Sequence, residues 1–191
     1  MTSTNCNLIS ANSDQQSESR VFIPRNLVAN LIGSAIKTLP KKTYGLIGGL
    51  DLYHPTSMYQ CRSNLRNSDS YWKERIDSFG DFYKNPERGF IIDPKEVLNV
   101  YKKMEEKKEH IVGVFHSHRC FVPGEPTEID MALHLQCQPH VLAYLLGVMD
   151  PAKPTLRVFK VLSEDQYREL NFSLLESPNK VLDFSCNKMG N

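Results

Sequence analysis

The sequence has no long apolar run, no pattern typical of a signal peptide and a formal net charge of only +1. No stretch approaches the roughly 20 apolar residues needed to cross a bilayer, and the N-terminus lacks the charged and then apolar segments of a signal peptide. The 23 Lys and Arg residues nearly balance the 22 Asp and Glu residues, so no overall field favours nucleic acid or anionic membranes. We therefore expect a cytoplasmic protein that binds neither.

The cysteines are few, and no two of them form a CxxC pair. The chain has five, an odd number, and they are widely scattered. This pattern fits reduced thiols better than a disulfide framework or a cysteine zinc site. Cys120 lies close to the histidines described below and in principle offers a soft ligand or a nucleophile. Because such reactivity needs a lowered thiol pKa, we interpret Cys120 as a loop thiol.

The length and composition indicate one globular domain. The chain has 191 residues, of which 40% are hydrophobic and 24% charged, enough for one sizeable core. Residues 1–20 are rich in Ser, Asn, Gln and Thr, which predicts a disordered N-terminal lead. We assign the domain to residues 21–165 and a C-terminal extension to residues 166–191, with a short helix expected around residues 164–176. The oligomeric state is left open.

Three helices are predicted from apolar spacing and capping signals. From Pro24, apolar residues recur on one helix face until Pro40 ends the pattern. Asp93 is the expected N-cap, and Pro94 the first residue, of a second helix that runs to about Lys108. The third is expected over Thr127–Gln136, with Thr127 as its N-cap. The second helix should bury four apolar residues: Val97, Leu98, Tyr101 and Met104.

Apolar segments between the helices predict strands, and residues 67–88 are expected to form an irregular insertion with one short helix. The expected strands are Tyr44–Leu50, Met58–Leu65, Phe90–Ile92, Ile111–Phe115, Val141–Met149 and Leu156–Val161. Strands that alternate with helices predict an α/β domain of the α+β type, in which helices flank a central mixed sheet.

The strongest functional signal is the segment from Gly113 to Asp130, which reads GVFHSHRCFVPGEPTEID. Residues i and i+2 of a strand point to the same face, so His116 and His118 present two imidazoles to one point. A loop with Pro and Gly then brings Asp130, in the first turn of the next helix, back towards them. Two imidazoles and one carboxylate suit Zn²⁺ and leave a fourth tetrahedral position for water.

An HxH pair taken alone is more often two surface histidines than a metal site. Here the pair ends an apolar strand, precedes a Pro/Gly loop and is followed by a carboxylate that opens a helix. This context favours an open zinc site, at which a bound water becomes acidic and a carbonyl is polarised.

The same segment resembles the JAMM or MPN-type zinc metallopeptidases, especially their prokaryotic branch. These proteins carry H-S-H at a strand end and P-S-x-x-D at a helix start, matched here by His116, Ser117 and His118 and by Pro126 to Asp130. The order of elements over residues 21–162 also matches. The resemblance implies a cytidine-deaminase-like architecture, a Zn²⁺ ion on the two histidines and Asp130, and catalytic roles for Ser117 and Thr127.

The implied activity is hydrolysis of a peptide or isopeptide bond at the C-terminal tail of a ubiquitin-like or sulfur-carrier protein. Three positions depart from the family pattern. Arg119 replaces a proline, and the loop before Asp130 is one residue longer. Thr127 replaces a serine that helps to hold the oxyanion, and its hydroxyl either does the same or only caps the helix. Lys42 replaces the general-base glutamate three residues before Gly45, and a protonated lysine cannot act as a base.

The remaining candidate residues each have an ordinary structural interpretation. Glu125, Glu128 and Asp51 are acidic candidates for the missing base, although each is expected to be a solvated surface group. His134 lies one helical turn after Asp130 and either orients a ligand or is a partly exposed helix residue. Trp72 and nearby aromatic residues either line a groove for an extended tail or belong to the core.

Three functions compete at this stage. A zinc-dependent hydrolase leads, because several motif positions match. A catalytically weak or inactive binding module for the same kind of partner is the alternative, and Lys42 is its main support. A non-haem iron oxygenase also uses two histidines and one carboxylate, but such sites usually lie in β-barrels, whereas this chain alternates helices with strands.

Overall fold

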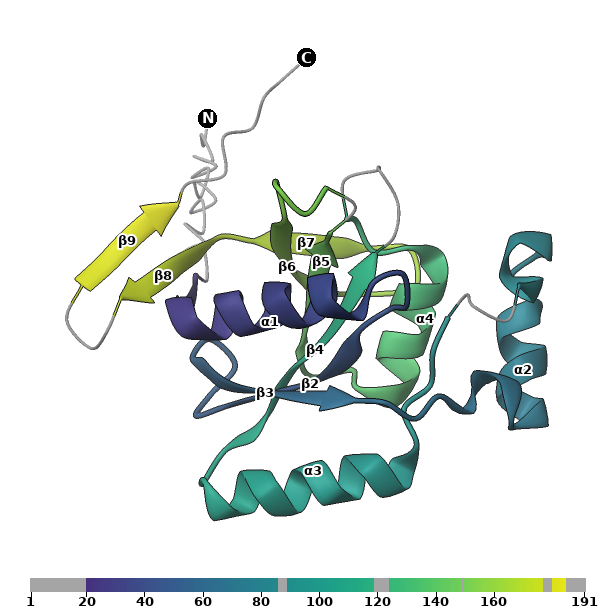
Figure 1. The fold of residues 1–191 in the computed structure, drawn as a ribbon. Coiled ribbons are helices and arrows are strands. Elements are labelled where there is room, and N and C mark those ends of the chain that lie inside the picture. Colours follow the sequence, from purple (N-terminus) through teal and green to yellow (C-terminus); the bar gives the residue numbers. More distant parts are fainter. Residues whose placement is uncertain (1–19, 86–88, 119–123, 149, 177–179, 185–191) are drawn as a thin grey trace, which may run out of the picture.

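The computed structural model describes residues 20–85, 89–118, 124–148, 150–176 and 180–184. Figure 1 shows the fold. The helices are α1 (Arg25–Thr38), α2 (Ser70–Asp77), α3 (Pro94–Glu106) and α4 (Glu128–Cys137), with 3-10 helices η1 (Leu65–Asn67) and η2 (Asp81–Lys84). The strands are β1 (Val21–Pro24), β2 (Tyr44–Gly49), β3 (Pro55–Cys61), β4 (His110–His118), β5 (Leu142–Gly147), β6 (Thr155–Val161), β7 (Tyr167–Leu170), β8 (Phe172–Glu176) and β9 (Lys180–Phe184). The expected disordered lead lies outside the described residues except for Arg20.

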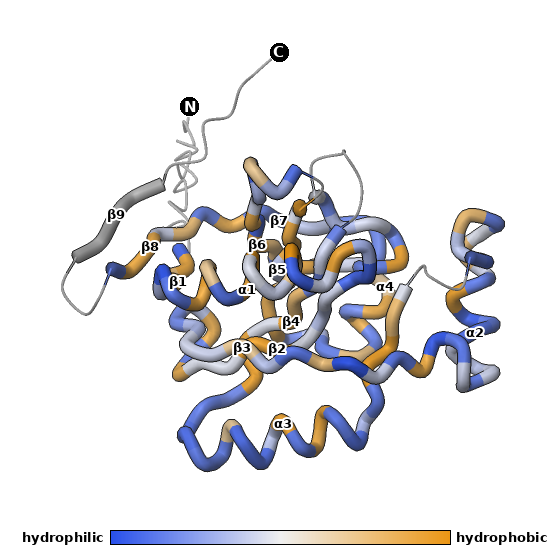
Figure 2. The backbone as a smooth tube through the Cα atoms, viewed as in Figure 1, coloured by the Kyte–Doolittle hydropathy of each residue, from blue (hydrophilic) through white to orange (hydrophobic). Residues whose placement is uncertain are grey.

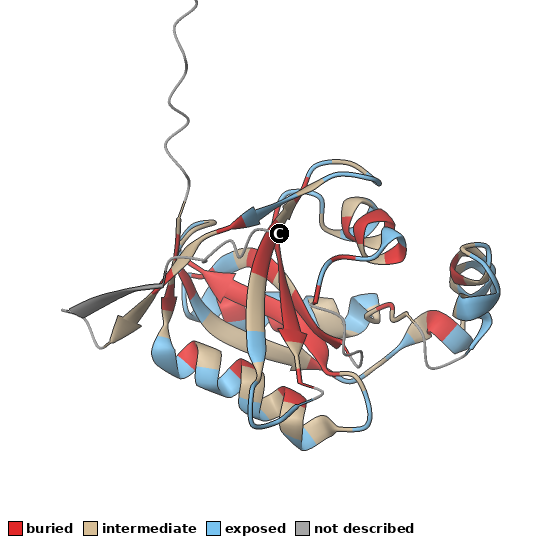
Figure 3. Cartoon of the chain, turned by 90° about the horizontal axis from the view of Figure 1, so that it is seen from above, coloured by how far each residue is buried: buried red, intermediate tan, exposed pale blue. Residues whose placement is uncertain are grey.

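A six-stranded mixed sheet with the order β3-β2-β4-β5-β6-β7 forms the centre of the domain. The pair β4 and β5 is parallel, and the other neighbours in this sheet are antiparallel. Seen from above, its central strands are largely buried (Figure 3). The expected single domain of the α+β type, with a mixed sheet flanked by helices, is confirmed. None of the described helices is long and apolar enough to cross a membrane.

Helices cover both faces of the sheet. Helix α1 packs through Leu27 and Leu31 against the face that carries Phe115. On the other face, α3 packs through Met104 and α4 through Met131. Hydrophobic residues recur along α3 between hydrophilic ones, as expected of a helix with one face on the sheet (Figure 2). Because strand residues alternate between faces, His116 and His118 lie on the α3 and α4 side, opposite Phe115.

The C-terminal part of the domain differs from expectation. The helix expected around residues 164–176 is wrong, because this segment forms β7 and β8. Strand β7 pairs with β6, and β8 pairs in parallel with β1 and antiparallel with β9 in a second, three-stranded sheet. Residues from the segment expected as an extension therefore join both sheets.

Two other expectations are corrected by polar contacts of the backbone. Ile91 is not in a strand: its N–H donates to Asn64 Oδ1 and its carbonyl accepts from the N–H of Leu65, the first residue of η1. Strand β3 ends at Cys61 rather than near Leu65, because the next two N–H groups donate to the Glu96 carboxylate.

The buried face of α3 is also rotated from the expected one. Asp93 caps the helix by accepting a hydrogen bond from the Lys95 N–H, as predicted. Val100 and Met104 are buried, whereas Leu98 and Tyr101 are 56% and 49% exposed. The residues facing the sheet thus follow the spacing of 97, 100 and 104, which keeps them on one side of the helix.

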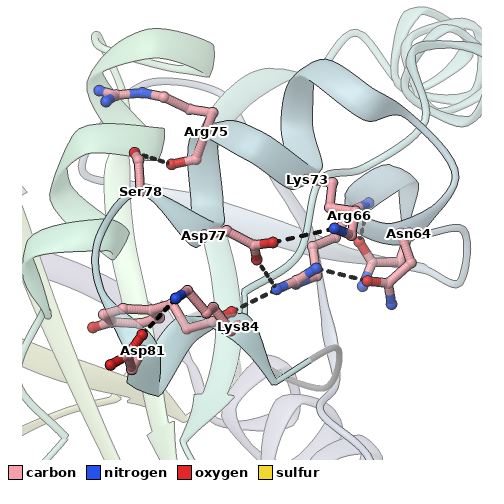
Figure 4. A network of polar contacts seen from close by, with 10 residues as sticks. Asn64, Arg66, Lys73, Arg75, Asp77, Ser78, Asp81 and Lys84 are labelled. Carbon is pink, nitrogen blue, oxygen red and sulfur yellow. Dashed lines mark hydrogen bonds and ion pairs between the residues drawn. The ribbon is translucent and has the colours of Figure 1, made fainter.

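The insertion between β3 and α3 contains η1, α2 and η2, as expected of a segment with one short helix, and is organised by a buried arginine. The Arg66 side chain is 1% exposed. Its guanidinium donates to Asn67 Oδ1 at 2.7 Å, to Asp77 Oδ1 at 2.7 Å and to the Tyr83 carbonyl (Figure 4). One side chain therefore joins all three helical pieces of the insertion.

Replacing Arg66 by alanine is expected to lower the free energy of unfolding by about 3 kcal/mol, because a fully buried side chain is lost and the Asp77 carboxylate and the Tyr83 carbonyl lose its hydrogen bonds. Urea unfolding of the purified variants measures this loss. Arg75 is the matched control, since it is 38% exposed and lies 4.0 Å from Glu164, and its replacement should cost less than about 0.5 kcal/mol. Equal losses for the two variants would contradict the role of Arg66.

Candidate metal centre

Two histidines at the end of β4 form the core of the site. His116 and His118 are both buried, and their Nε2 atoms lie 2.8 Å apart. The strand that carries them is held on both sides, since Tyr44 of β2 is opposite His116 and Leu145 of β5 is its parallel neighbour. The two imidazoles are therefore placed by a rigid sheet and not by a loop.

Asp130 completes the group from the first turn of α4. Its Oδ1 lies 3.2 Å from His116 Nε2 and its Oδ2 lies 3.2 Å from His118 Nε2. The ligand atoms of the three residues all lie within 4.8 Å of one another. The structure thus brings together the three residues predicted as ligands, from two elements that are separated in sequence.

The donor set fits a small divalent cation. Two nitrogens bound to a tetrahedral Zn²⁺ lie about 3.3 Å apart, given bonds of roughly 2.0 Å. The two Nε2 atoms here, at 2.8 Å, would have to separate by only about half an ångström. His116, His118 and Asp130 could therefore hold a metal ion, with three protein ligands and a further position for water or substrate.

The surroundings of His116 and Asp130 keep these two residues in the protonation states that bind metal. Burial lowers the pKa of His116 to about 4, so its imidazole is neutral at neutral pH with a lone pair to offer. Burial alone would raise the pKa of Asp130, but the two imidazoles beside it hold that pKa well below its usual range. The site thus combines the neutral His116 nitrogen with the anionic Asp130 oxygen.

Thr127 fixes the start of α4 and the orientation of Asp130. The two residues form a capping box, in which the Asp130 N–H donates to the Thr127 hydroxyl and the Asp130 carboxylate accepts from the Thr127 N–H. The Thr127 hydroxyl also donates to Asp130 Oδ2 at 2.7 Å. Because its only proton is committed to the carboxylate, the geometry favours the capping role over donation to an oxyanion.

Replacing Thr127 by alanine should weaken both the helix start and the metal site. We expect a loss of about 1 kcal/mol in the free energy of unfolding and a fall in metal affinity on the order of 10-fold to 100-fold. Urea unfolding and titration with Zn²⁺ measure the two effects. Thr127→Ser keeps the hydroxyl and should restore both, whereas an affinity unchanged in the alanine variant would show that the cap does not orient Asp130.

Ser117 is not brought to the group formed by His116, His118 and Asp130, which could hold a metal ion and is called the metal-binding group below. It lies between the two histidines and faces the other side of the sheet, where it is fully buried. Its hydroxyl accepts a hydrogen bond of 2.9 Å from the Thr43 N–H, and its own N–H donates to the Thr43 carbonyl. Ser117 therefore has a structural role, namely joining the segment before β2 to β4, and its catalytic role stays a prediction of the family resemblance.

Lys42 lies beside the candidate metal centre. It precedes Tyr44, the residue opposite His116, by two positions. Its positive charge contributes to the lowered pKa of His116. Lys42 thus lies beside the centre, at the position that the family resemblance assigns to a general base. It supplies a positive charge there and no base.

The acidic residues considered as replacement bases are placed elsewhere. Gly49 pairs with His110 at the other end of β4, so Asp51 lies about 20 Å along the strands from His116. Asp51 also contacts His54 at 2.8 Å. Glu125 is 53% exposed and 3.5 Å from Arg157, and Glu128 is exposed on α4. As expected, these carboxylates belong to the surface.

Other residues singled out in the sequence have structural roles. His134 is buried rather than partly exposed, and its Nε2 contacts the Val141 carbonyl at 3.1 Å, so it is not part of the metal-binding group. Trp72 packs against a small core cluster with Ile76 and Ile129, in line with the core interpretation. Arg119 and Cys120 lie outside the described residues.

Phe90 is a site residue that the sequence interpretation missed. Its ring stacks on Tyr44 at a centroid distance of 4.6 Å and lies 5.2 Å from the His116 ring. It also lines two cavities, an apolar one of about 120 Å³ that includes His116 and a larger one of about 930 Å³ that includes Lys42. Because Phe90 is assigned to a strand from the sequence, its contact with His116 is not predicted. No local sequence pattern indicates this contact.

The fold is similar to that of two bacterial proteins with solution structures. A protein from Desulfitobacterium hafniense has a TM-score of 0.60 and 22% identity, over 82% of this chain and 94% of that one. A protein from Salinibacter ruber strain DSM 13855 has a TM-score of 0.52 and 15% identity, over 86% of this chain and 96% of that one. At these identities the likeness shows the fold alone. No known protein family and no curated protein matches the chain.

Proposed function

We propose that this protein is a zinc-dependent hydrolase of the JAMM or MPN type, which acts on peptide or isopeptide bonds at the C-terminal tail of a ubiquitin-like or sulfur-carrier protein. The observation that carries the proposal is the convergence of His116, His118 and Asp130 within 4.8 Å of one another. The H-S-H motif at a strand end and the aspartate at a helix start support the family assignment.

In this proposal, four residues of the chain would hold or orient the metal ion. A bound Zn²⁺ supplies an acidified water and polarises the scissile carbonyl. His116, His118 and Asp130 would hold the ion, and Thr127 would keep Asp130 oriented through the capping box. Lys42, at the position of the family's general base, would place a cation beside the ion and would supply no base.

A binding module without strong catalysis is the second candidate, and a specific observation favours it. Among the described residues, the metal-binding group contains no carboxylate besides Asp130 that could act as a base. The larger cavity beside it is lined by Lys37, Lys41, Lys42 and Arg62. Positive charge in a cleft attracts acidic segments, so this surface suits retention of an acidic tail.

Metal analysis combined with a cleavage assay tests the proposal. The purified full chain should contain about one Zn²⁺ per molecule and should cleave a sulfur-carrier protein extended beyond its Gly-Gly end, with loss of cleavage in a chelator. Zinc without cleavage would favour the binding module. Bound iron with dioxygen-dependent turnover would favour the oxygenase, and absence of any bound metal would refute the metal centre.

A further inference from the structure

An apolar cavity of about 120 Å³ opens beside two of the three metal-binding residues. His116 and Asp130 line one part of it, and the rest lies between the sheet, α4 and residues 89–92. Most of the lining is aliphatic. These residues come from four strands and one helix: Leu46 on β2, Val114 on β4, Ala143 and Leu145 on β5, Val161 on β6 and Leu133 on α4.

The size of this cavity sets it apart from ordinary packing defects. Protein interiors rarely hold voids larger than a water molecule, and a single water needs only about 10–15 Å³ of such space. The volume of about 120 Å³ is comparable with engineered apolar cavities that bind a benzene ring. Its lining offers few polar partners, so an apolar group fits this space better than a water cluster.

The position of the cavity identifies its occupant. A peptide whose scissile carbonyl lies at the metal centre must place the side chains next to that bond within a few ångströms of His116 and Asp130. These same two residues line the apolar space. A side chain adjacent to the bond can therefore enter it, whereas the basic cavity that Phe90 also lines suits acidic groups.

We infer that this cavity is a specificity pocket, which accepts a large apolar side chain of the substrate directly beside the bond that is cut. The inference rests on the proposed hydrolase function and narrows its substrate class. Leucine, methionine and phenylalanine have side chains that fill a space of this size, whereas glycine leaves it empty. The preferred tail therefore carries a large apolar residue on one side of the bond.

A peptide series tests the pocket with the metal-loaded full chain. The peptides share one sequence apart from the two residues that flank the central bond. At each of these two positions in turn, the series carries Gly, Ala, Leu, Met or Phe. Burial of a large aliphatic side chain should raise kcat/KM by on the order of 10-fold to 100-fold over glycine at one of the two positions. Chelator-sensitive cleavage with no such preference at either position would refute the proposed pocket but would still support the proposed hydrolase function.

Two variants change the pocket without touching a metal-binding residue. Ala143→Leu fills it and should reduce the preference for leucine over glycine to below about threefold, whereas Val161→Ala enlarges it and should shift the preference towards phenylalanine. Ala132 is the matched control, because it is a buried alanine of α4 that does not line the cavity. Ala132→Leu should keep the original preference, and thermal unfolding shows whether each variant is folded.

A binding measurement separates failure of the pocket from failure of the hydrolase. N-acetyl-leucinamide should perturb the methyl resonances of Ala143, Leu145 and Val161 in NMR spectra, and N-acetyl-glycinamide should not. If no peptide is cleaved but these perturbations occur, the hydrolase proposal fails and the apolar pocket stands. If they are absent from the folded protein, the pocket is refuted whether or not cleavage occurs.

Discussion

Replacing His118 by alanine should reduce the bound metal from about one ion per chain to nearly none. His118 Nε2 lies 2.8 Å from His116 Nε2 and 3.2 Å from Asp130 Oδ2, so its loss removes one of three converging ligands. Loss of groups that merely orient a ligand already costs 10-fold to 100-fold in affinity, and we expect a loss above about 100-fold for the ligand itself. Elemental analysis and Zn²⁺ titration measure this change, and chelator-sensitive cleavage should disappear with it.

The same strand offers a matched control for this experiment. His110 is an exposed histidine at the other end of β4, where it pairs with Gly49. His110→Ala changes the same residue type on the same element and should leave metal content unchanged. Both variants are compared by circular dichroism, since a misfolded chain would also lose metal. Full metal content in folded His118→Ala would place any metal site elsewhere and refute the assignment of this group.

The parts of the fold that were predicted correctly are those with local signals. Helix α1 lies between Pro24 and Pro40, and α3 begins with an Asp93-Pro94 pair whose carboxylate caps the first turn. Such signals act within a few residues, so they can be read from the sequence. Strands β7 and β8 depend on partners far along the chain, with Phe172 opposite Val21. The polar sequence around them gave no period that separates strand from helix.

The candidate site divides in the same way. The metal-binding group could be predicted because i and i+2 share a strand face and Asp130 opens a helix after a turn. The same alternation already places Ser117 on the opposite face, so its catalytic assignment by resemblance conflicted with strand geometry. Phe90 could not be found this way, because its contact with His116 joins a loop to a strand 26 positions away.

Replacing Lys42 by glutamate should increase cleavage on the order of 10²-fold to 10⁴-fold, the range expected of a well-placed general base. Lys42 adjoins the metal-binding group, and its charge opposes positive charge on His116. A carboxylate there would accept a proton from metal-bound water and would also remove a cation that repels the metal. The measurement is kcat/KM for the extended sulfur-carrier protein, with metal affinity determined in parallel.

Two control variants separate the base from the charge. Lys42→Gln removes the cation without supplying a base, so it should tighten metal binding but leave cleavage within about 10-fold of the original. Lys41 lies next to it and lines the same basic cavity, so Lys41→Glu makes the same change of charge one position away and should not raise cleavage. If Lys42→Glu binds metal and still shows no gain, position 42 does not govern catalysis. The binding module would then account for a buried metal-binding group beside a basic cavity better than the hydrolase does.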